Sequence, residues 1–272
     1  MAIVLLSYAD GPEVYQSNQR ALVRSAREQG IELVKAFSRA DLREAFRTEH
    51  DSILRAEEGA GYWLWKPRII LDALEAAPEN QIVVYVDVGA TLRQPLDVLV
   101  EQARLHEGVF FWNDYPNWMH VKRDCFALTA TNTPQYHQAR QVDAALIVLR
   151  NTERVRSFVR EWLAACTDPR ILTDLPNTCG EENLPGFRGH RHDQSVLTVL
   201  LLRERAKLDF KFYARRVKHR FICHHRRRTR WMPIWAWEAT HDGAGRYWST
   251  LRRRWRTGRT RLARLVSGSF RK

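Results

Sequence analysis

The sequence predicts an α/β fold in which helices flank a mostly parallel central sheet. Strand-like and helix-like patterns alternate from Ile3 to Val86, as in the opening of a parallel sheet. Ile82–Val86 is continuously apolar and rich in β-branched side chains, as a strand buried on both faces requires. The 272 residues are 44% hydrophobic and 28% charged, so the chain can bury a core without disulfides or a metal.

The strands of this sheet are expected in five apolar runs. They are Ile3–Leu6, Ile31–Phe37, Ile82–Val86, Gly108–Trp112 and Ala144–Leu149. Each run is short and bounded by polar residues, Gly or Pro, which is typical of a strand. These runs therefore predict a sheet built from segments that are far apart in the sequence.

Helices are expected between and after the strands. They run to about Gln29, from Asp41 to Glu58, onward from Lys66, from about Thr152 to Cys166 and from about Asp193 to Arg205. Gly30 stops the first helix, Asp41 caps the second, and Pro67 occupies a first-turn position that tolerates proline. Residues 167–189 are rich in Pro, Gly and Asn, and this long irregular stretch is interpreted as a substrate loop.

Charge is distributed unevenly along the chain. Residues 203–272 hold 22 of the 44 Lys and Arg residues but 4 of the 31 Asp and Glu residues, a net charge of +18. Residues 1–202 have a net charge of −5. A nucleic-acid-binding core would carry positive charge on the fold itself, whereas here an acidic body ends in a cationic segment. This pattern indicates docking to an anionic surface through one end.

The cysteines and the N-terminus indicate a cytoplasmic protein. The four cysteines, at positions 125, 166, 179 and 223, show no C-x-x-C spacing, so neither a zinc site nor a disulfide framework is expected. Residues 1–8 lack a basic region, and their apolar run is too short for a signal peptide. No run reaches the roughly 18 apolar residues of a membrane-spanning helix.

Two motifs near the first strands contain residues that are suited to binding a ligand. Asp87 directly follows the central strand, and ligands of α/β sheets bind at the carboxyl ends of strands. Gly61–Pro67 places three aromatic residues and Lys66 at the start of a helix, where phosphate is favoured. A carboxylate, a cation and aromatic rings together suit a nucleotide.

Three later motifs are further candidates. Lys122–Asp124 precedes an apolar stretch and offers charge for a diphosphate or hydrogen bonds for a sugar. Asp193 and Gln194 open a helix, where an acidic and an amide side chain can hold sugar hydroxyls. The pair at 224 and 225 is placed to bring an imidazole to Asp87 and complete a divalent metal site.

Each motif also has an ordinary structural explanation. Asp87 can cap a turn, Trp63 and Trp65 can be core aromatics, and Lys122–Asp124 can be a plain helix start. Asp193 can be an N-cap, and the adjacent histidines beside four arginines can belong to a surface patch. The motifs taken singly leave these alternatives open.

Taken in order, the motifs resemble bacterial GT-A glycosyltransferases of the capsule and lipopolysaccharide type. The likeness extends distantly to the retaining galactosyltransferase and glycogenin group. The segments that carry it are Gly61–Pro67, Val84–Gly89, Lys122–Phe126, Asp143–Asn151, Glu161–Trp162 and His192–Ser195. The resemblance implies a Rossmann-like GT-A catalytic domain over residues 1–225, a nucleotide-diphosphate sugar as donor, a glycan or lipid-linked acceptor, and retention of anomeric configuration.

The resemblance also suggests roles for individual residues. It assigns catalysis to Asp193 and Gln194, and acceptor binding to Asp143 and His192. The residues expected to bind the nucleotide sugar are Tyr8, Lys66, Asp87, Arg123 and Asp124. Cations such as Lys66 and Arg123 would face the diphosphate, because negative charge develops on the departing nucleotide.

The metal implied by the resemblance is left open. In the family, a second carboxylate two residues after the first is a principal ligand of Mn²⁺ or Mg²⁺. Gly89 stands at that position here. The remaining candidate metal ligands are Asp87, His224 and His225, together with the diphosphate of the donor.

Residues 226–272 are expected to form a basic amphipathic helical appendage. Trp248, Leu251 and Trp255 recur at near-helical spacing among many arginines, which is typical of a segment lying in a membrane interface. Each cation near an anionic leaflet contributes about 1 kcal/mol. We therefore expect peripheral attachment to the inner face of the cytoplasmic membrane.

The alternative function is a non-catalytic protein that binds RNA or lipid through the basic arm. Aromatic residues among arginines also suit single-stranded nucleic acid. We expect nucleic acid to be the less favoured partner, because the positive charge is confined to one end of an acidic body.

Overall fold

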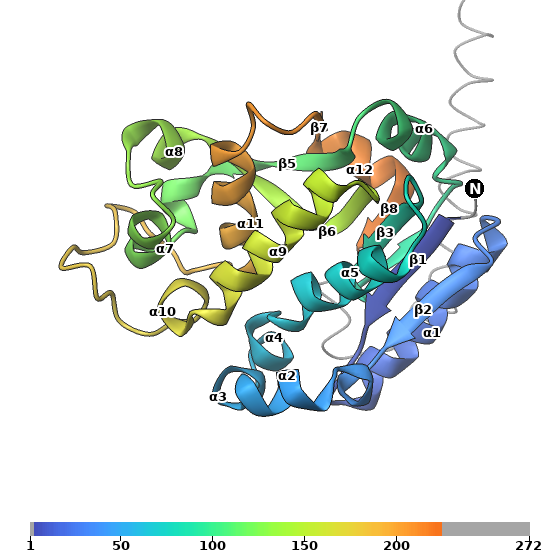
Figure 1. The fold of residues 1–272 in the computed structure, drawn as a ribbon, viewed down its shortest axis with the longest axis horizontal. Helices are drawn as coiled ribbons and strands as arrows, with labels where there is room; N and C mark the ends of the chain where they lie inside the picture. Colours follow the sequence, from blue (N-terminus) through green and yellow to red (C-terminus); the bar gives the residue numbers. More distant parts are fainter. Residues whose placement is uncertain (1–2, 225–272) are drawn as a thin grey trace, which may run out of the picture.

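A computed structural model describes residues 3–224 of the chain, and their main feature is one six-stranded sheet (Figure 1). Its order is β2-β1-β3-β6-β5-β7, and every strand except β6 runs in the same direction. The strands are β1 (Ile3–Tyr8), β2 (Leu33–Phe37), β3 (Ile82–Val86), β5 (Gly108–Pro116), β6 (Arg140–Arg150) and β7 (Phe210–Ala214). The predicted α/β class with a mostly parallel sheet is confirmed.

Helices cover both faces of the sheet. One face packs against α5 (Trp65–Ala76), α9 (Glu153–Thr167) and α11 (His192–Arg203), which Figure 1 shows in front of the strands. The other face packs against α1 (Glu13–Glu28), α6 (Asp97–Leu105) and α12 (Arg215–Phe221). Successive strand residues alternate between the two cores: Leu5 and Val84 lie in one, Leu6 and Tyr85 in the other.

The parallel strands β1 and β3 end at the same edge of the sheet. Tyr8 is the last residue of β1, and Asp87 directly follows β3. A second, two-stranded sheet pairs β4 (Ala90–Leu92) with β8 (Ile222–His224), so residues 222–224 return to a position just beyond Asp87. The carboxyl edge of the sheet thus collects segments from both ends of the described chain.

The first long helix after β2 is broken, and its prediction is wrong. The span from Asp41 to Glu58 holds η1 (Arg39–Asp41), α2 (Glu44–Glu49) and α3 (Asp51–Leu54), followed by α4 (Gly59–Tyr62). The Asp41 carboxylate accepts hydrogen bonds from the backbone and hydroxyl of Ser38, at 2.8 and 2.7 Å. This reciprocal cap closes a short 3-10 turn, after which Leu42 is extended and stops the helix.

The remaining short helices lie between β5 and α11. They are η2 (Asn117–Met119), α7 (Arg123–Leu128), α8 (Pro134–Gln138) and α10 (Pro169–Leu172). Residues 173–191 contain no helix or strand, in agreement with the predicted irregular stretch.

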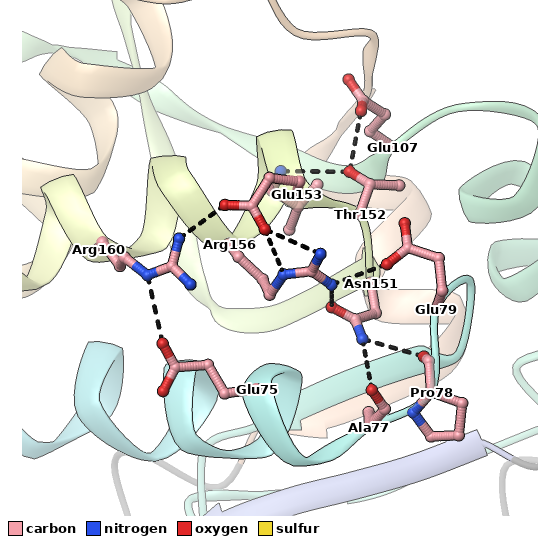
Figure 2. Close-up of polar contacts among 11 residues, drawn as sticks. Glu75, Ala77, Pro78, Glu79, Glu107, Asn151, Thr152, Glu153, Arg156 and Arg160 are labelled. Atoms are coloured by element: carbon pink, nitrogen blue, oxygen red, sulfur yellow. Dashed lines mark hydrogen bonds and ion pairs between the residues drawn. The ribbon is translucent and has the colours of Figure 1, made fainter.

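A polar network fixes the end of β6 and the start of α9 against the neighbouring loop (Figure 2). The Asn151 amide donates to the carbonyls of Ala77 and Pro78, at 2.9 and 3.0 Å. Arg156 and Arg160 both bind Glu153, and each also binds a second glutamate across the helix pair. The network is remote from the carboxyl edge and anchors the face on which the site is built.

The predicted basic appendage at 226–272 lies outside the described residues, as does His225. His224 is placed only through its backbone pairing with Ala90. Within residues 3–224, no helix has the length and apolar character needed to cross a membrane.

Candidate active site

Three charged side chains from distant parts of the chain meet at the carboxyl edge of the sheet. Lys66 lies in the first turn of α5, Asp87 follows β3, and Asp193 lies in the first turn of α11. The Lys66 Nζ is 2.7 Å from Asp193 Oδ2 and 3.3 Å from Asp87 Oδ1. The Lys66 and Asp193 side chains are 3% and 4% exposed, and that of Asp87 is 15% exposed. A buried ammonium thus bridges two carboxylates.

The electrostatics of this cluster keep the lysine charged. Burial by itself lowers the pKa of the Lys66 ammonium, but the charges of Asp193 and Asp87 outweigh it and raise the pKa above its ordinary value. Burial also raises the pKa of the Asp193 carboxyl, against the opposing effect of Lys66. Asp193 is therefore a better proton acceptor than an exposed aspartate, and it faces a permanent cation.

Neighbouring groups hold the cluster in one geometry. The Tyr85 hydroxyl donates to Asp87 Oδ1 at 2.7 Å, and Lys66 Nζ lies 5.1 Å from the Tyr85 ring centroid. Lys66 also donates to the Ala144 carbonyl at 3.4 Å. The helix dipole opposes a cation in the first turn of α5 and favours an anion in the first turn of α11. The two carboxylates offset the unfavourable position of Lys66.

Two adjoining cavities open on this cluster. The smaller, of about 450 Å³, is lined by Lys66, Asp87 and Asp193. The larger, of about 950 Å³, is lined by Asp87 and by residues at the end of β1, including Tyr8. Glu58, Trp63 and Asp87 line both and form their junction. Of the three charged residues, Asp87 is therefore the one that both cavities reach, with Lys66 and Asp193 beside it in the smaller cavity.

The aromatic residues of the Gly61–Pro67 motif lie partly in the core and partly beside a cavity. Trp65 is buried and stacks on Tyr8, with ring centroids 4.0 Å apart, and its indole N–H donates to the Gly59 carbonyl at 2.9 Å. Trp63 is half-buried at the junction of the cavities. The core alternative is thus correct for Trp65, although an edge of it also reaches the larger cavity.

A left-handed turn sets the position of Trp63. All five residues from 59 to 63 have positive φ, with values of 58°, 51°, 100°, 53° and 59°. This conformation costs about 1–2 kcal/mol for each non-glycine residue. At Gly61 a Cβ would lie 2.7 Å from the Leu54 Cα, so only glycine fits. Such strain, directly beside a cavity, is common at functional sites.

Gln194 and His192 flank Asp193 and line the smaller cavity. The Gln194 side chain accepts from the Ala144 backbone at 3.2 Å and donates to Gln141 at 2.7 Å, which fastens α11 to β6. The His192 ring stacks on Trp63, with centroids 5.6 Å apart, while its Nδ1 lies 2.9 Å from the Leu172 carbonyl. Both residues are brought to the site, and their predicted chemical roles stay predictions.

Arg123 and Asp124 are not among the residues that line either cavity. Arg123 forms an ion pair with Glu181, at 2.9 Å, and its guanidinium donates to the Glu182 carbonyl, at 3.1 Å. The Asp124 carboxylate accepts from the backbone of Thr178 and Cys179, at 2.8 to 2.9 Å. These hydrogen bonds lower the pKa of Asp124 although burial opposes them. Both residues thus anchor the irregular stretch, and their predicted part in binding the nucleotide sugar stays a prediction.

Asp143 is also set apart from the cavities. It lies on β6, where it forms an ion pair with the buried Lys218 of α12, and its carboxylate accepts from the Ala145 backbone at 2.9 Å. It is not among the residues that line either cavity. Its predicted part in acceptor binding stays a prediction.

The described residues do not fit a divalent metal at Asp87. The Asp87 Oδ1 already interacts with Lys66 and Tyr85, and Gly89 supplies no carboxylate. A divalent cation bound there would lie beside a buried ammonium, and the repulsion between like charges is strong at that separation. In the part of the chain from 3 to 224, no group of three His, Cys, Asp or Glu residues is arranged to hold a metal.

Several residues of the smaller cavity were missed by the sequence analysis. Arg188, His190 and Arg191 line it, together with His120 and Glu58. The basic run Arg-Gly-His-Arg-His, which ends at His192, stands directly before Asp193 and was the available signal. His120 carries no such signal, because its position depends on the packing of η2 against residues 188–191.

The comparisons with known proteins give structural matches only. No protein-family model matches the sequence, and comparison with curated protein sequences gives no match. Mouse xyloside xylosyltransferase 1 in its apo form is 13% identical over 79% of this chain and 85% of its own, with a TM-score of 0.43. A glycosyltransferase involved in glycosylation of the major capsid of PBCV-1 is 11% identical over 82% and 93%, with a TM-score of 0.45.

A third similar structure is the bifunctional glycosyltransferase WbbM in its apo form. It is 11% identical, and the match covers 78% of this chain but 38% of that one, with a TM-score of 0.46. These three similar structures are all glycosyltransferases.

Proposed function

We propose that this protein is a glycosyltransferase. It moves a sugar from a nucleotide diphosphate to a glycan or lipid-linked acceptor in the synthesis of a cell-surface polysaccharide, with retention of anomeric configuration. The observation that carries the proposal is the meeting of Lys66, Asp87 and Asp193 where two cavities adjoin. A transfer reaction needs two substrates to approach one set of charged groups, and this arrangement provides it. The resemblance of the ordered motifs to GT-A enzymes supports the same conclusion.

The larger cavity receives the nucleotide. Its walls include the exposed Tyr15, whose ring suits stacking on a base, and the Asp10 carboxylate, which accepts hydrogen bonds from hydroxyl or amino groups. It also lies at the carboxyl ends of β1 and β3, where α/β sheets bind ligands. The donor sugar then lies at the junction near Asp87, and the acceptor enters through the smaller cavity.

Lys66 and Asp193 act on opposite charges of the reaction. Cleavage of the sugar–phosphate bond puts negative charge on the departing nucleotide, and the fixed Lys66 ammonium stabilises that charge. Positive charge on the anomeric carbon is stabilised by the Asp193 carboxylate. Retention in one step requires the acceptor oxygen to approach on the face that the nucleotide leaves, so the departing phosphate oxygen beside Lys66 accepts the proton of the acceptor hydroxyl as the new glycosidic bond forms. The burial of both groups strengthens these interactions, because the local dielectric constant is low.

A thermal-shift screen tests the donor site. The chain is heated with UDP, GDP, ADP and CDP, each in EDTA and in Mn²⁺. Because Lys66 already supplies a cation, we expect one nucleotide to raise the melting temperature equally in both conditions. A ligand at a hundred times its Kd contributes about 2.7 kcal/mol to stability.

The control for this screen is a pair of lysine variants. Lys66→Met should lose the stabilisation by nucleotide, and Lys207→Met, which changes an exposed lysine paired with Glu204, should keep it. The proposal fails if no nucleoside diphosphate stabilises the wild-type chain.

Attachment to membranes is a separate proposal, which rests on the composition of residues 226–272. We propose that this basic segment binds the anionic inner face of the cytoplasmic membrane. Full-length protein should sediment with phosphatidylglycerol vesicles and not with phosphatidylcholine vesicles, and a chain ending at 225 should lose this binding. That cut leaves β8 paired with β4. Binding to single-stranded RNA in preference to anionic vesicles would instead favour the RNA-binding function.

A further inference from the structure

The smaller cavity has a cationic wall made by Arg188 and Arg191, and His120 lies beside them. These three residues line the smaller cavity and are not among the residues that line the larger one. The residues shared by the two cavities, such as Asp87, lie at their junction. The cationic wall therefore belongs to the smaller cavity and not to the proposed donor compartment.

The two arginines of this wall are not neutralised by carboxylates. Among residues 3–224, neither Arg188 nor Arg191 has an Asp or Glu oxygen within the 4.0 Å of an ion pair. Arg156 and Arg160 are paired with glutamates (Figure 2), whereas Arg24 and Arg140 also lack an ion pair within the described residues but line neither cavity, so Arg188 and Arg191 are distinguished by their position beside a cavity. Two unpaired guanidinium groups beside one cavity are suited to an anion that is not part of the described chain.

The wall is held in place by the backbone. The Arg188 N–H donates to the Met119 carbonyl at 2.9 Å, and the Arg191 N–H donates to the His120 carbonyl at 3.1 Å. The Arg191 guanidinium lies over the Tyr115 ring, 5.0 Å from its centroid, and Tyr115 contacts the His120 ring edge-on. Because these contacts fix the backbone of both arginines and the side chain of Arg191 before a ligand binds, less conformational entropy is lost on binding.

The positive charges of Arg188 and Arg191 affect the pKa of a histidine that lines the same cavity. Burial lowers the pKa of His120, and the nearby charges of Arg191 and Arg188 lower it further. His120 is therefore neutral at physiological pH, and its pKa responds to the positive field of the two arginines. The same cavity also carries Asp87 and Asp193 around Lys66. A ligand in this cavity therefore has both carboxylates and guanidinium groups among its neighbours.

We propose that Arg188 and Arg191 bind an anionic group of the acceptor, so that the acceptor is a sugar phosphate or an acidic sugar rather than a neutral saccharide. This inference rests on the proposed function, which places the acceptor in the smaller cavity. The planar guanidinium group matches the oxygen geometry of phosphate and carboxylate. The diphosphate of the donor offers the same chemistry, and the experiment separates the two sources.

The experiment measures affinities of the full-length protein by calorimetry at physiological salt. The probes are glucose 6-phosphate, glucuronate and glucose, together with the nucleoside diphosphate selected by the thermal-shift screen. The variants are Arg188→Gln and Arg191→Gln, and Arg170→Gln is the matched control. Arg170 is exposed, pairs with Asp168, and lies outside both cavities.

We expect the two anionic sugars to bind the wild-type protein at least tenfold more tightly than glucose. Arg188→Gln and Arg191→Gln should each weaken the anionic sugars at least tenfold and change nucleotide affinity less than twofold, and Arg170→Gln should change neither. Arg188 is exposed, so its replacement tests the wall without disturbing the fold, and an unchanged melting temperature verifies this.

Two results would overturn the inference. Equal binding of glucose and the anionic sugars, including no detectable binding of any, removes the acceptor-anion site. Loss of nucleotide affinity in Arg188→Gln or Arg191→Gln assigns the wall to the donor diphosphate instead. Failure of the proposed function is a distinct result, because it appears as the absence of nucleotide binding in the wild-type protein.

Discussion

Two lysines are buried against aspartates in this fold, and their surroundings differ. Lys66 contacts Asp87 and Asp193 and lines the smaller cavity. Lys218 pairs with Asp143 between α12 and β6, and neither residue is among those that line the two cavities. The side chains of Lys66 and Lys218 are 3% and 2% exposed, so burial does not distinguish them. Access to a cavity, rather than a buried ion pair alone, therefore distinguishes the candidate site.

The largest expected difference is in kcat between two aspartate variants, Asp193→Asn and Asp143→Asn. Asp193→Asn removes the charge that is proposed to face the transferred sugar and should lower kcat by about 10²–10³-fold, because loss of one group aimed at transition-state charge costs that much. Asp143→Asn should leave kcat within a few-fold of wild type. Release of nucleotide from the donor, corrected for melting temperature, measures both. An equal loss of turnover in Asp143→Asn would break the comparison and support its role in acceptor binding.

The stability of the two lysine variants should change by similar amounts. Lys66→Met and Lys218→Met each leave a buried carboxylate without its cation, which destabilises a fold by about 3–5 kcal/mol. Urea unfolding measures this loss for both variants. Nucleotide affinity, measured under conditions where each variant is folded, should fall only for Lys66→Met. A fall in affinity for Lys218→Met would show that the two pairs act as one unit.

A pair of glycine variants tests the left-handed turn beside Lys66. Gly61→Ala places a Cβ 2.7 Å from the Leu54 backbone at φ 100°, and we expect a loss of about 2–3 kcal/mol in the free energy of unfolding. Gly89→Ala is the control, because its Cβ would meet nothing within 4 Å and its φ is not in the left-handed region. A neutral Gly61→Ala variant would contradict the strained turn. Chemical denaturation measures both.

The smallest expected effect is a dependence of the free energy of unfolding on pH that arises from His190. Its Nδ1 accepts from the Lys122 backbone at 3.2 Å, and its Nε2 lies 2.9 Å from the Ile171 carbonyl, so the ring is neutral. Burial holds the pKa of His190 well below 6.5. The unfolded chain binds a proton at His190 more readily than the folded protein does. The contribution of the neutral histidine to stability is therefore complete above about pH 6.5. As the pH falls toward the folded pKa, the free energy of unfolding decreases by up to about 1.4 kcal/mol per pH unit.

The prediction for His190 is tested by measuring how the free energy of unfolding changes with pH between about pH 7.5 and 5.5. His190→Gln keeps a donor toward Ile171 but does not titrate, so its slope should be smaller than that of wild type. Hydrogen exchange at low pH should increase near residues 188–192 before it increases around Lys218. An unchanged slope in His190→Gln would contradict the neutral, buried histidine.

The sequence predicted the central strands well and the site in part. Ile82–Val86 was correct at both ends, because a continuous β-branched run has few alternatives. The span after Asp41 was wrong, since a local cap with Ser38 outweighed helical periodicity. Lys66, Asp87 and Asp193 were found because each stands at the end of an element. The pairing of Lys66 with both carboxylates depends on tertiary packing, which no local pattern records.

The irregular stretch between α10 and α11 is firmly anchored to the body. Lys122 Nζ donates to the carbonyls of Thr173 and Leu175, and Asp124 accepts from the backbone of Thr178 and Cys179. A segment bound in this way has already lost its chain entropy during folding. The proposed saccharide acceptor should therefore meet a preformed surface, and we expect its association to be a single kinetic step whose observed rate rises linearly with concentration.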